Sequence, residues 1–212
     1  MATTIRRFRG DPWELLERFR EQQRKSPNDS QPYQFQGGVA VPIARDIAIL
    51  STHKRGDFAG LRRMDPNEPD TAAFWRLMAS EGLLGNPDAE RKWALIMCGI
   101  ALMTRTAADD NPFNRSAHNG SMPVGRALYE SGYSETRFNR LLTARDDMLR
   151  VLLTRMFRML AAEQATFDWR EMAAFILNDG FNDERAEEGR RRLARAYYRA
   201  ERRGSQQSET QQ

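Results

Sequence analysis

The sequence predicts an all-α fold, a helical bundle with room for two small helical lobes. Apolar residues recur three or four positions apart in much of the chain, which is the spacing of a helix face. No segment alternates apolar and polar residues with period two, and no repeat of fixed length is visible. With 212 residues, the chain is long enough to bury a core without disulfides or structural metals.

The N-terminal region opens with a predicted helix over residues 11–25, in which an aspartate N-cap precedes a proline at the first helical position. Residues 26–42 are rich in Pro, Gly, Gln and Asn, which indicates a loop. A helix is expected over residues 42–50. The segment 53–64 is short and basic, and the proline-containing stretch "DPNEPD" ends it.

Two clearer helices follow. Residues 70–81 are predicted to form a helix capped by Asp70 or Thr71. Residues 88–104 contain the apolar run "WALIMCGIALM", which is too short to span a bilayer and therefore indicates a buried helix. Cys98 lies within this run as a small apolar residue.

The C-terminal part begins with a short predicted helix at 122–132, which Gly132 ends. Residues 134–160 carry large apolar residues at helical spacing. Asp146 and Asp147 interrupt this segment, and either can cap a second helix. The segment therefore predicts two helices that share a core.

The last two predicted helices span 166–179, capped by Asp168, and 182–203, which is amphipathic. The tail "GSQQSETQQ" has a disordered composition. The predicted organisation is an N-terminal extension with one helix and a polar loop (1–50), an N-terminal helical lobe (51–104), a polar linker (105–121), a C-terminal helical lobe (122–203) and a disordered tail (204–212).

The composition points to an intracellular protein. The formal net charge is +4, and all of the 33 basic residues except Lys25, Lys54 and Lys92 are arginine. A GC-rich genome produces this bias without any function, although a guanidinium suits phosphate better than an ammonium does. With Cys98 as the one cysteine, no internal disulfide can form. The N-terminus lacks the apolar core of a signal peptide, so we expect a cytoplasmic protein without a membrane segment.

Motifs of enzymes and metal sites are missing from the sequence. It contains no GxxxxGKS/T phosphate loop, no GxGxxG after a strand and no GxSxG nucleophile motif. His53 and His118 have no neighbouring ligand at the spacing of a metal site. We therefore predict no enzyme activity, no cofactor and no metal.

The arginines are the remaining candidates for function. Residues 134–159 hold six arginines and no lysine. If the helix is continuous, four of them fall on one edge of its apolar face: Arg137, Arg140, Arg155 and Arg158. An arginine there lays its stem on the core and directs its guanidinium outward. A second basic cluster lies in "HKRGDFAGLRRM" (53–64). Such clusters attract phosphates, although ordinary surface arginines produce the same pattern.

Three blocks of sequence together resemble one known family. They are "RGDFAGLRRMDPNEPDTAAFWRLM" (55–78), "GRALYESGYSETRFNRLL" (125–142) and "FDWREMAAFIL" (167–177). In order and spacing they are similar to the small subunit of type I-E CRISPR surveillance complexes, the CasB family of Cascade. The chain departs from the family pattern in its N-terminal addition, its polar connection and its tail.

The resemblance implies a helical, non-catalytic subunit that acts in antiviral defence. The implied partners are other Cascade subunits, a second copy of the chain, guide RNA, and target DNA with its displaced strand. Base pairing reads the sequence in such complexes, so the protein binds the backbone and stabilises the R-loop.

Position by position, the resemblance implies nucleic-acid contacts at arginines in the "LRR", "GRAL" and "SETRFNRLLTAR" blocks and at two positions outside them. These residues are Arg62, Arg63, Arg91, Arg126, Arg137, Arg140, Arg145 and Arg158. Trp169 in "FDW" is expected to pack in the core rather than to stack on a base.

Two other functions remain open. The first is a free-standing helical DNA-binding regulator, since "GYSETRFNRLL" has the form of a recognition helix after a tight turn, with Ser134 as its cap. The second is a structural helical adaptor whose arginines pair only with its own carboxylates.

Overall fold

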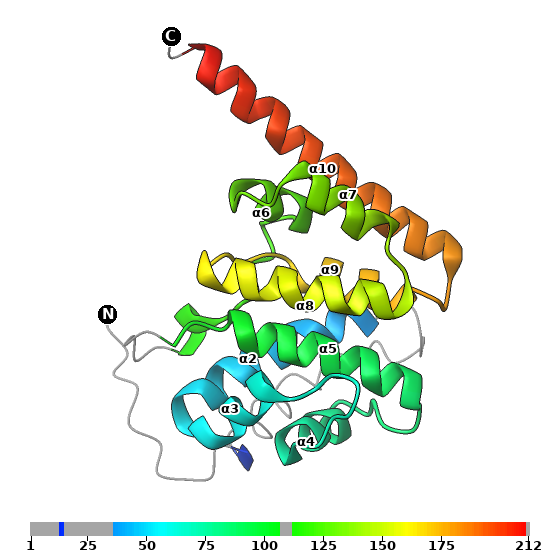
Figure 1. The fold of residues 1–212 in the computed structure, drawn as a ribbon. Coiled ribbons are helices and arrows are strands. Elements are labelled where there is room, and N and C mark those ends of the chain that lie inside the picture. Colours follow the sequence, from blue (N-terminus) through cyan, green and yellow to red (C-terminus); the bar gives the residue numbers. More distant parts are fainter. Residues whose placement is uncertain (1–12, 15–35, 107–111, 211–212) are drawn as a thin grey trace, which may run out of the picture.

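The computed structural model describes residues 13–14, 36–106 and 112–210, and in these ranges the fold is built from α-helices (Figure 1). The helices are α2 (Gln36–His53), α3 (Arg55–Arg63), α4 (Ala72–Ser80), α5 (Pro87–Met103), α6 (Val124–Glu130), α7 (Glu135–Thr143), α8 (Asp146–Ala162), α9 (Trp169–Asn178) and α10 (Asp183–Thr210), with a short 3-10 helix, η1 (Pro112–Arg115). These ranges contain no strand, and an isolated parallel β-bridge joins His118 to Phe167. The all-α prediction is therefore confirmed.

Helix α5 forms the middle of the core. Asn86 caps its start, and every residue from 93 to 101 is buried, which confirms the buried helix predicted over 88–104. At Gly99 an added Cβ would lie 2.7 Å from the ring of Phe157 and 2.8 Å from the ring of Trp169. Trp169 is fully buried, as predicted. Two aromatic rings from α8 and α9 thus pack directly on the backbone of α5.

Helix α2 begins earlier than the sequence predicts. It starts at Gln36, inside the segment 26–42 whose composition indicates a loop. Gly37 lies against α9, where an added Cβ would be 2.8 Å from the carbonyl oxygen of Arg170. The glycine that suggests a loop therefore serves a close contact between two helices.

Residues 13–14 come from the helix predicted over 11–25, and the rest of that helix lies outside the described residues. The indole N–H of Trp13 donates to Asp57 Oδ2 at 3.2 Å. The guanidinium of Arg76 lies over the Trp13 ring, 5.4 Å from its centroid. Trp13 therefore contacts both α3 and α4.

Helices α6, α7 and α10 pack together in the C-terminal part (Figure 1). The backbones of α6 and α10 approach closely at Gly125, where an added Cβ would lie 2.1 Å from the carbonyl oxygen of Leu193. The Tyr197 ring of α10 stacks on Phe138 of α7, with centroids 4.1 Å apart. The Tyr197 hydroxyl donates to the carbonyl oxygen of Tyr133 at 2.7 Å. These contacts hold the three helices as one unit.

One hydrophobic core joins the two halves of the chain. Buried residues from α2 through α10 belong to a single cluster. Figure 1 shows α8 between α5 on one side and the α6–α10 pair on the other. The division into lobes at 105–121 stays a prediction. Helix α10 extends to Thr210, beyond the end that its apolar pattern predicts at 203.

Candidate nucleic-acid interface

A groove runs along the surface between α3, α5 and α8, and we refer to it as the α3–α5–α8 groove. Its volume is about 870 Å³. Two carboxylates, Asp65 and Asp147, and five arginines from α3 and α8 line it. The arginines are Arg62, Arg63, Arg150, Arg155 and Arg158. The groove lining therefore carries an excess of positive charge.

Helix α8 presents arginines to this groove because its two faces differ. Leu149, Leu153 and Met156 are buried, whereas Arg155 and Arg158 are exposed on the other side. Arginines three residues apart share one helix face. The helix begins at Asp146, which confirms the predicted break in the 134–160 segment.

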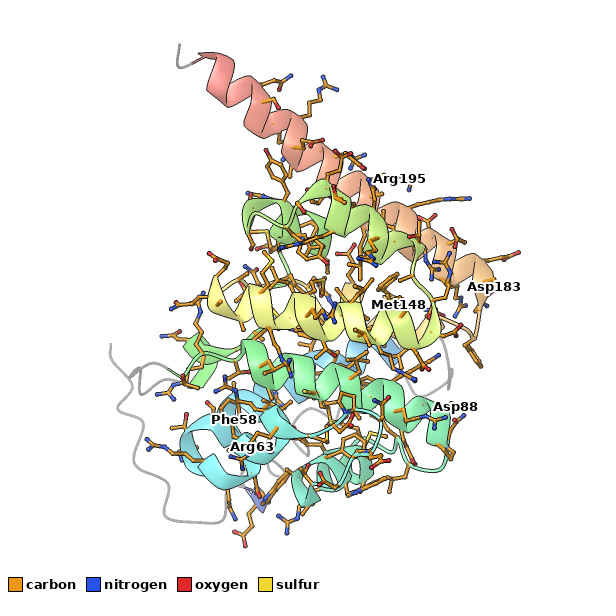
Figure 2. The ribbon with its side chains drawn as sticks, viewed as in Figure 1. Phe58, Arg63, Asp88, Met148, Asp183 and Arg195 are labelled. Carbon is orange, nitrogen blue, oxygen red and sulfur yellow. The ribbon has the colours of Figure 1, made fainter. Side chains whose placement is uncertain are left out.

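Helix α3 ends in the other two groove arginines. Arg62 and Arg63 form its last turn, where a positive charge interacts favourably with the helix dipole. Phe58 and Leu61 are the buried residues of this helix. The Arg62 guanidinium lies over the Phe58 ring, 5.7 Å from its centroid, and Figure 2 shows Phe58 and Arg63 on this helix.

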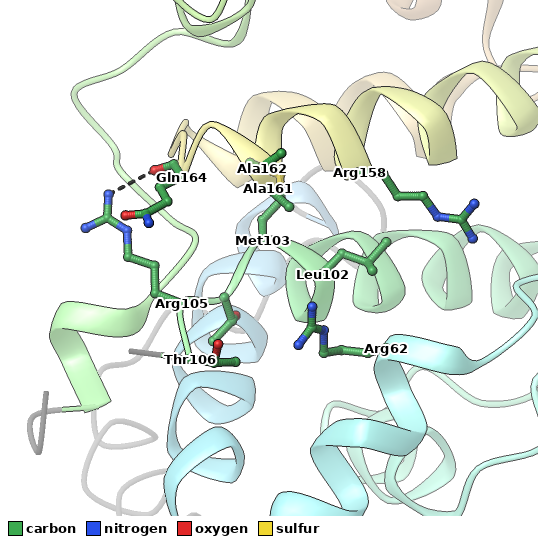
Figure 3. A pocket seen from close by; sticks show the side chains of 10 residues that line it. Arg62, Leu102, Met103, Arg105, Thr106, Arg158, Ala161, Ala162 and Gln164 are labelled. Carbon is green, nitrogen blue, oxygen red and sulfur yellow. Dashed lines mark hydrogen bonds between the residues drawn. The ribbon is translucent and has the colours of Figure 1, made fainter. Parts of the chain in front are cut away.

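A second hollow, of about 490 Å³, continues the groove toward the end of α5 (Figure 3). Arg62 and Arg158 line both spaces, and Figure 3 shows them on opposite sides of Leu102. Arg105 joins them and donates to the carbonyl oxygen of Gln164 at 2.9 Å. Among the described residues, no carboxylate lines this second hollow. The two spaces form one continuous arginine-lined surface.

Most of these arginines have no internal counter-ion. Within the described ranges, Arg62, Arg63, Arg155 and Arg158 form no salt bridge. Arg150 pairs with Asp147, whose side chain is 86% exposed. An exposed pair of this kind competes only weakly with an incoming anion.

The floor of the groove is apolar and chemically inert. Leu95 and Cys98 of α5 form part of it. Burial raises the pKa of the Cys98 thiol to about 11, so the thiol stays protonated and unreactive at neutral pH. No aromatic ring of the described chain lines the groove, so it offers no platform for stacking bases. The groove suits backbone phosphates better than bases.

The structure brings together three of the eight arginines predicted to contact nucleic acid: Arg62, Arg63 and Arg158. Arg91 lies instead at the start of α5, where it pairs with Asp88. The hollow around Arg91 is lined mainly by acidic and apolar residues. Its charge is therefore balanced locally.

Three further predicted residues lie on α6 and α7 and do not line the groove. Arg126 Nε donates to Glu130 Oε1 at 2.6 Å on the exposed face of α6. Arg137 and Arg140 are exposed on α7 and form no salt bridge within the described part of the chain. The predicted arginines thus occupy several surfaces rather than one track.

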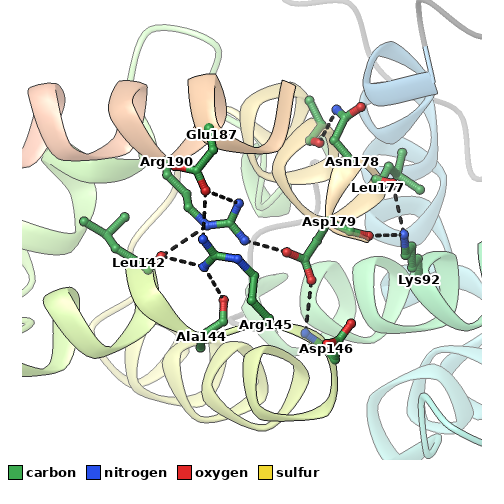
Figure 4. A network of polar contacts seen from close by, with 11 residues as sticks. Lys92, Leu142, Ala144, Arg145, Asp146, Leu177, Asn178, Asp179, Glu187 and Arg190 are labelled. Atoms are coloured by element: carbon green, nitrogen blue, oxygen red, sulfur yellow. Dashed lines mark hydrogen bonds and ion pairs between the residues drawn. The ribbon is translucent and has the colours of Figure 1, made fainter. Parts of the chain in front are cut away.

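Arg145 belongs to a polar network at the corner between α7 and α8 (Figure 4). Its Nη1 donates to the carbonyl oxygens of Leu142, at 3.0 Å, and Ala144, at 2.9 Å. Its Nη2 donates to Glu187 Oε1 of α10 at 2.8 Å. Arg145 therefore has a structural role as well as an exposed charge.

A buried ion pair forms the centre of this network. Arg190 Nη2 donates to Asp179 Oδ1 at 2.5 Å, and the two side chains are 6% and 9% exposed. Asp179 Oδ2 accepts from the backbone N–H of Asp146 at 3.2 Å. Asp146 has a φ of 50°, which non-glycine residues adopt infrequently. The pair thus fixes the unusual start of α8, and with it the direction of the arginine face.

The contacts implied by the resemblance did not include Arg105, Arg150 or Arg155. The arginine pattern of residues 134–159 does contain Arg150 and Arg155, and it places Arg155 on the same helix edge as Arg158. Arg105 follows the end of α5 in the polar connection, where no helical pattern indicates its direction. The described residues also contain no candidate metal site, since no three of their His, Cys, Asp or Glu side chains could hold a metal ion together.

The described helices include none with the length and apolar character needed to cross a bilayer. In comparisons with known proteins, a family model described as CRISPR-associated protein Cse2 matches residues 57–198. No curated protein matches the chain. No solved structure matches it either. The matched residues include α5, α8 and nearly all of α3, which together form the groove.

Proposed function

Because the chain belongs to the family of CRISPR-associated protein Cse2, the small subunit of type I-E Cascade complexes, we propose that it grips nucleic-acid backbone in the α3–α5–α8 groove. In this role it stabilises the R-loop and its displaced strand during antiviral defence. The observation that carries the proposal is the convergence of Arg62, Arg63, Arg155 and Arg158, from two separate helices, on one groove without internal salt bridges among the described residues.

The chemistry of the groove supports backbone binding without base reading. A guanidinium forms two parallel hydrogen bonds to a phosphate, and each neutralised phosphate releases counterions. In an RNA-guided complex, base pairing supplies the sequence specificity. The guide RNA–DNA duplex that forms in an R-loop is about as stable as the DNA duplex that it replaces. A few charge contacts can therefore decide whether the R-loop persists.

The remaining predicted arginines have a secondary place in this proposal. Arg137 and Arg140 on α7 are exposed and available to a second stretch of backbone. Arg91 and Arg145 would first have to leave Asp88 and Glu187, respectively. We expect them to contribute less than the groove arginines.

The proposed partners follow from the same assignment. They are the other Cascade subunits, a second copy of this chain, guide RNA and target DNA. The proposed role is non-catalytic, since the groove holds arginines and an inert thiol rather than an activated nucleophile. The proposed location is the cytoplasm, which membership of a CRISPR-complex family supports.

The test is equilibrium binding of the purified full chain to a fluorescent single-stranded DNA, measured by anisotropy at several salt concentrations. We compare wild type with the triple variant Arg62→Ala, Arg63→Ala, Arg158→Ala. Each lost phosphate contact reduces the slope of log affinity against log salt by about 0.7. Three lost contacts reduce it by about 2, so between 50 and 200 mM salt the wild type loses about 20-fold more affinity than the variant.

The matched control is the triple variant Arg191→Ala, Arg195→Ala, Arg202→Ala. It removes the same charge from exposed positions on α10, outside the groove. Equal slopes for the groove variant and this control would refute the groove assignment. Tight binding of the isolated chain to one palindromic duplex would favour the DNA-binding regulator instead. Absence of any nucleic-acid affinity, alone or assembled, would favour the structural adaptor.

A further inference from the structure

A second arginine-lined hollow lies between α6 and α10, and we call it the α6–α10 hollow. Its volume is about 460 Å³. Arg126 of α6 and Arg199 and Arg203 of α10 line it, with Glu130 as the one carboxylate of its lining among the described residues. Arg199 and Arg203 are exposed, and in the part of the chain that the structure describes neither forms a salt bridge. No lining residue is shared with the α3–α5–α8 groove.

The two helices that form the walls of this hollow pack closely against each other. An added Cβ at Gly125 would lie 2.1 Å from the carbonyl oxygen of Leu193, so α6 rests directly on the backbone of α10. Farther along, an added Cβ at Gly204 would lie 2.6 Å from the hydroxyl of Tyr129. The two glycines therefore permit close contacts between α6 and α10 beside the arginines of the hollow.

The spacing of the arginines fits a charged polymer. Arg199 and Arg203 are four residues apart on one helix face, which separates their Cα atoms by about 6 Å along the axis. Phosphates follow one another about every 3.4 Å along the axis of a strand in a duplex. Arg199 and Arg203 can therefore meet phosphates that are two positions apart.

The lining is less suited to a protein partner. Interface hot spots are usually packed in desolvated pockets, whereas Arg126, Arg199 and Arg203 are exposed. Tyr129 is the one aromatic residue that the described chain places in this lining, and the alanines Ala196 and Ala200 offer little area. A phosphodiester backbone needs only positive charge and hydrogen-bond donors.

We propose that the α6–α10 hollow is a second phosphodiester-binding surface, so that one copy of the chain holds nucleic acid at two separate places. Arg199 and Arg203 lie outside the residues that the family model matches, which end at 198. The inference rests on the proposed function, because it assumes a nucleic-acid ligand for the chain.

The test uses the full chain and the same labelled single-stranded DNA. The hollow variant is Arg126→Ala, Arg199→Ala, Arg203→Ala, and the matched control is Arg191→Ala, Arg195→Ala, Arg202→Ala. Arg126 would first have to leave Glu130, so Arg199 and Arg203 carry most of the expected effect. The hollow variant should therefore reduce the salt slope by about 1.4 to 2, a difference of about 7- to 20-fold in affinity between 50 and 200 mM salt. Replacing the same three arginines with lysine keeps the charge and should preserve most of the slope.

Three outcomes separate this inference from the proposed function. A reduced slope for both the groove variant and the hollow variant, with an additive effect in the sixfold variant, supports both. A reduced slope for the groove variant alone overturns the second surface and leaves the groove intact. A hollow variant that binds DNA normally but no longer assembles with the other subunits also overturns the inference, because the hollow is then a protein contact.

Discussion

Replacing Arg190 with alanine should destabilise the protein strongly, because this arginine is buried within the polar network that joins α7, α8 and α10. The side chain is 6% exposed and donates to Asp179 Oδ1, to the carbonyl oxygen of Leu142 and to Glu187 Oε1. It also lies over the ring of Phe175, 5.6 Å from the centroid. Its removal leaves a buried carboxylate without its charged partner.

The expected magnitude follows from burial. Breaking a buried ion pair by removing one partner costs about 3–5 kcal/mol. For a chain of 212 residues, each kcal/mol shifts Tm by about 2–4 °C, so Arg190→Ala should lower Tm by about 10 °C. The start of α8 should loosen as well, because Asp179 also accepts from the backbone N–H of Asp146.

The assay is thermal unfolding followed by circular dichroism. Arg191→Ala serves as the control, since its side chain is exposed and its removal should change stability by no more than about 0.5 kcal/mol. The double variant Arg190→Met, Asp179→Asn should recover much of the loss, because it removes both charges and keeps a side-chain acceptor for the backbone N–H of Asp146. A Tm for Arg190→Ala within about 2 °C of wild type would refute the reasoning, since it corresponds to about 1 kcal/mol or less.

Two further predictions concern the C-terminal helices. Gly125→Ala should cost about 3 kcal/mol or more, because the new methyl group would meet the carbonyl oxygen of Leu193 at 2.1 Å, and no rotamer change relieves a backbone contact. Urea unfolding checks this, with Gly56→Ala as a control that should be neutral or stabilising, because a Cβ there meets nothing within 4 Å. Burial raises the pKa of Glu171, whose Oε2 accepts from the backbone N–H of Val124 at 2.8 Å. Ionisation of Glu171 is therefore less favourable in the folded chain than in the unfolded chain. The stabilisation of the fold by the protonated side chain is fully present below pH 4.5, and it is lost as pH rises through the raised pKa. Glu171→Gln keeps the hydrogen-bond acceptor and removes the titration. In urea unfolding, the free energy of unfolding of this variant relative to wild type should therefore rise between about pH 4 and pH 7. A difference between the two proteins that stays constant with pH would contradict this account.

The helices that the sequence predicts best are those with one apolar and one polar face. Helices α7 and α8 belong to this group, because each buries one side and exposes the other. Helix α2 was harder to predict, since residues such as Ile43, Ile47 and Ile49 are buried on several sides and leave no periodic contrast. Its glycines and Pro42 also resemble those of a loop.

The candidate site was only partly predictable for a related reason. The sequence displays the charge of an arginine but not its distant neighbours. Arg62 and Arg158 are far apart in sequence and line the same groove. Arg145 looks equally available in the sequence, yet its guanidinium contacts Leu142, Ala144 and Glu187. Only the folded chain separates the arginines that line the groove from those held in internal hydrogen bonds.

The most direct test of the central claim is an arginine footprint. The full chain, free and bound to single-stranded DNA, is treated with a dicarbonyl reagent that modifies exposed guanidinium groups, and the modified peptides are quantified by mass spectrometry. We predict that bound DNA protects Arg62, Arg63 and Arg158, whereas Arg191 and Arg202 react as in the free protein. Equal modification of the three groove arginines in the free and bound protein, with protection elsewhere, would contradict the groove assignment.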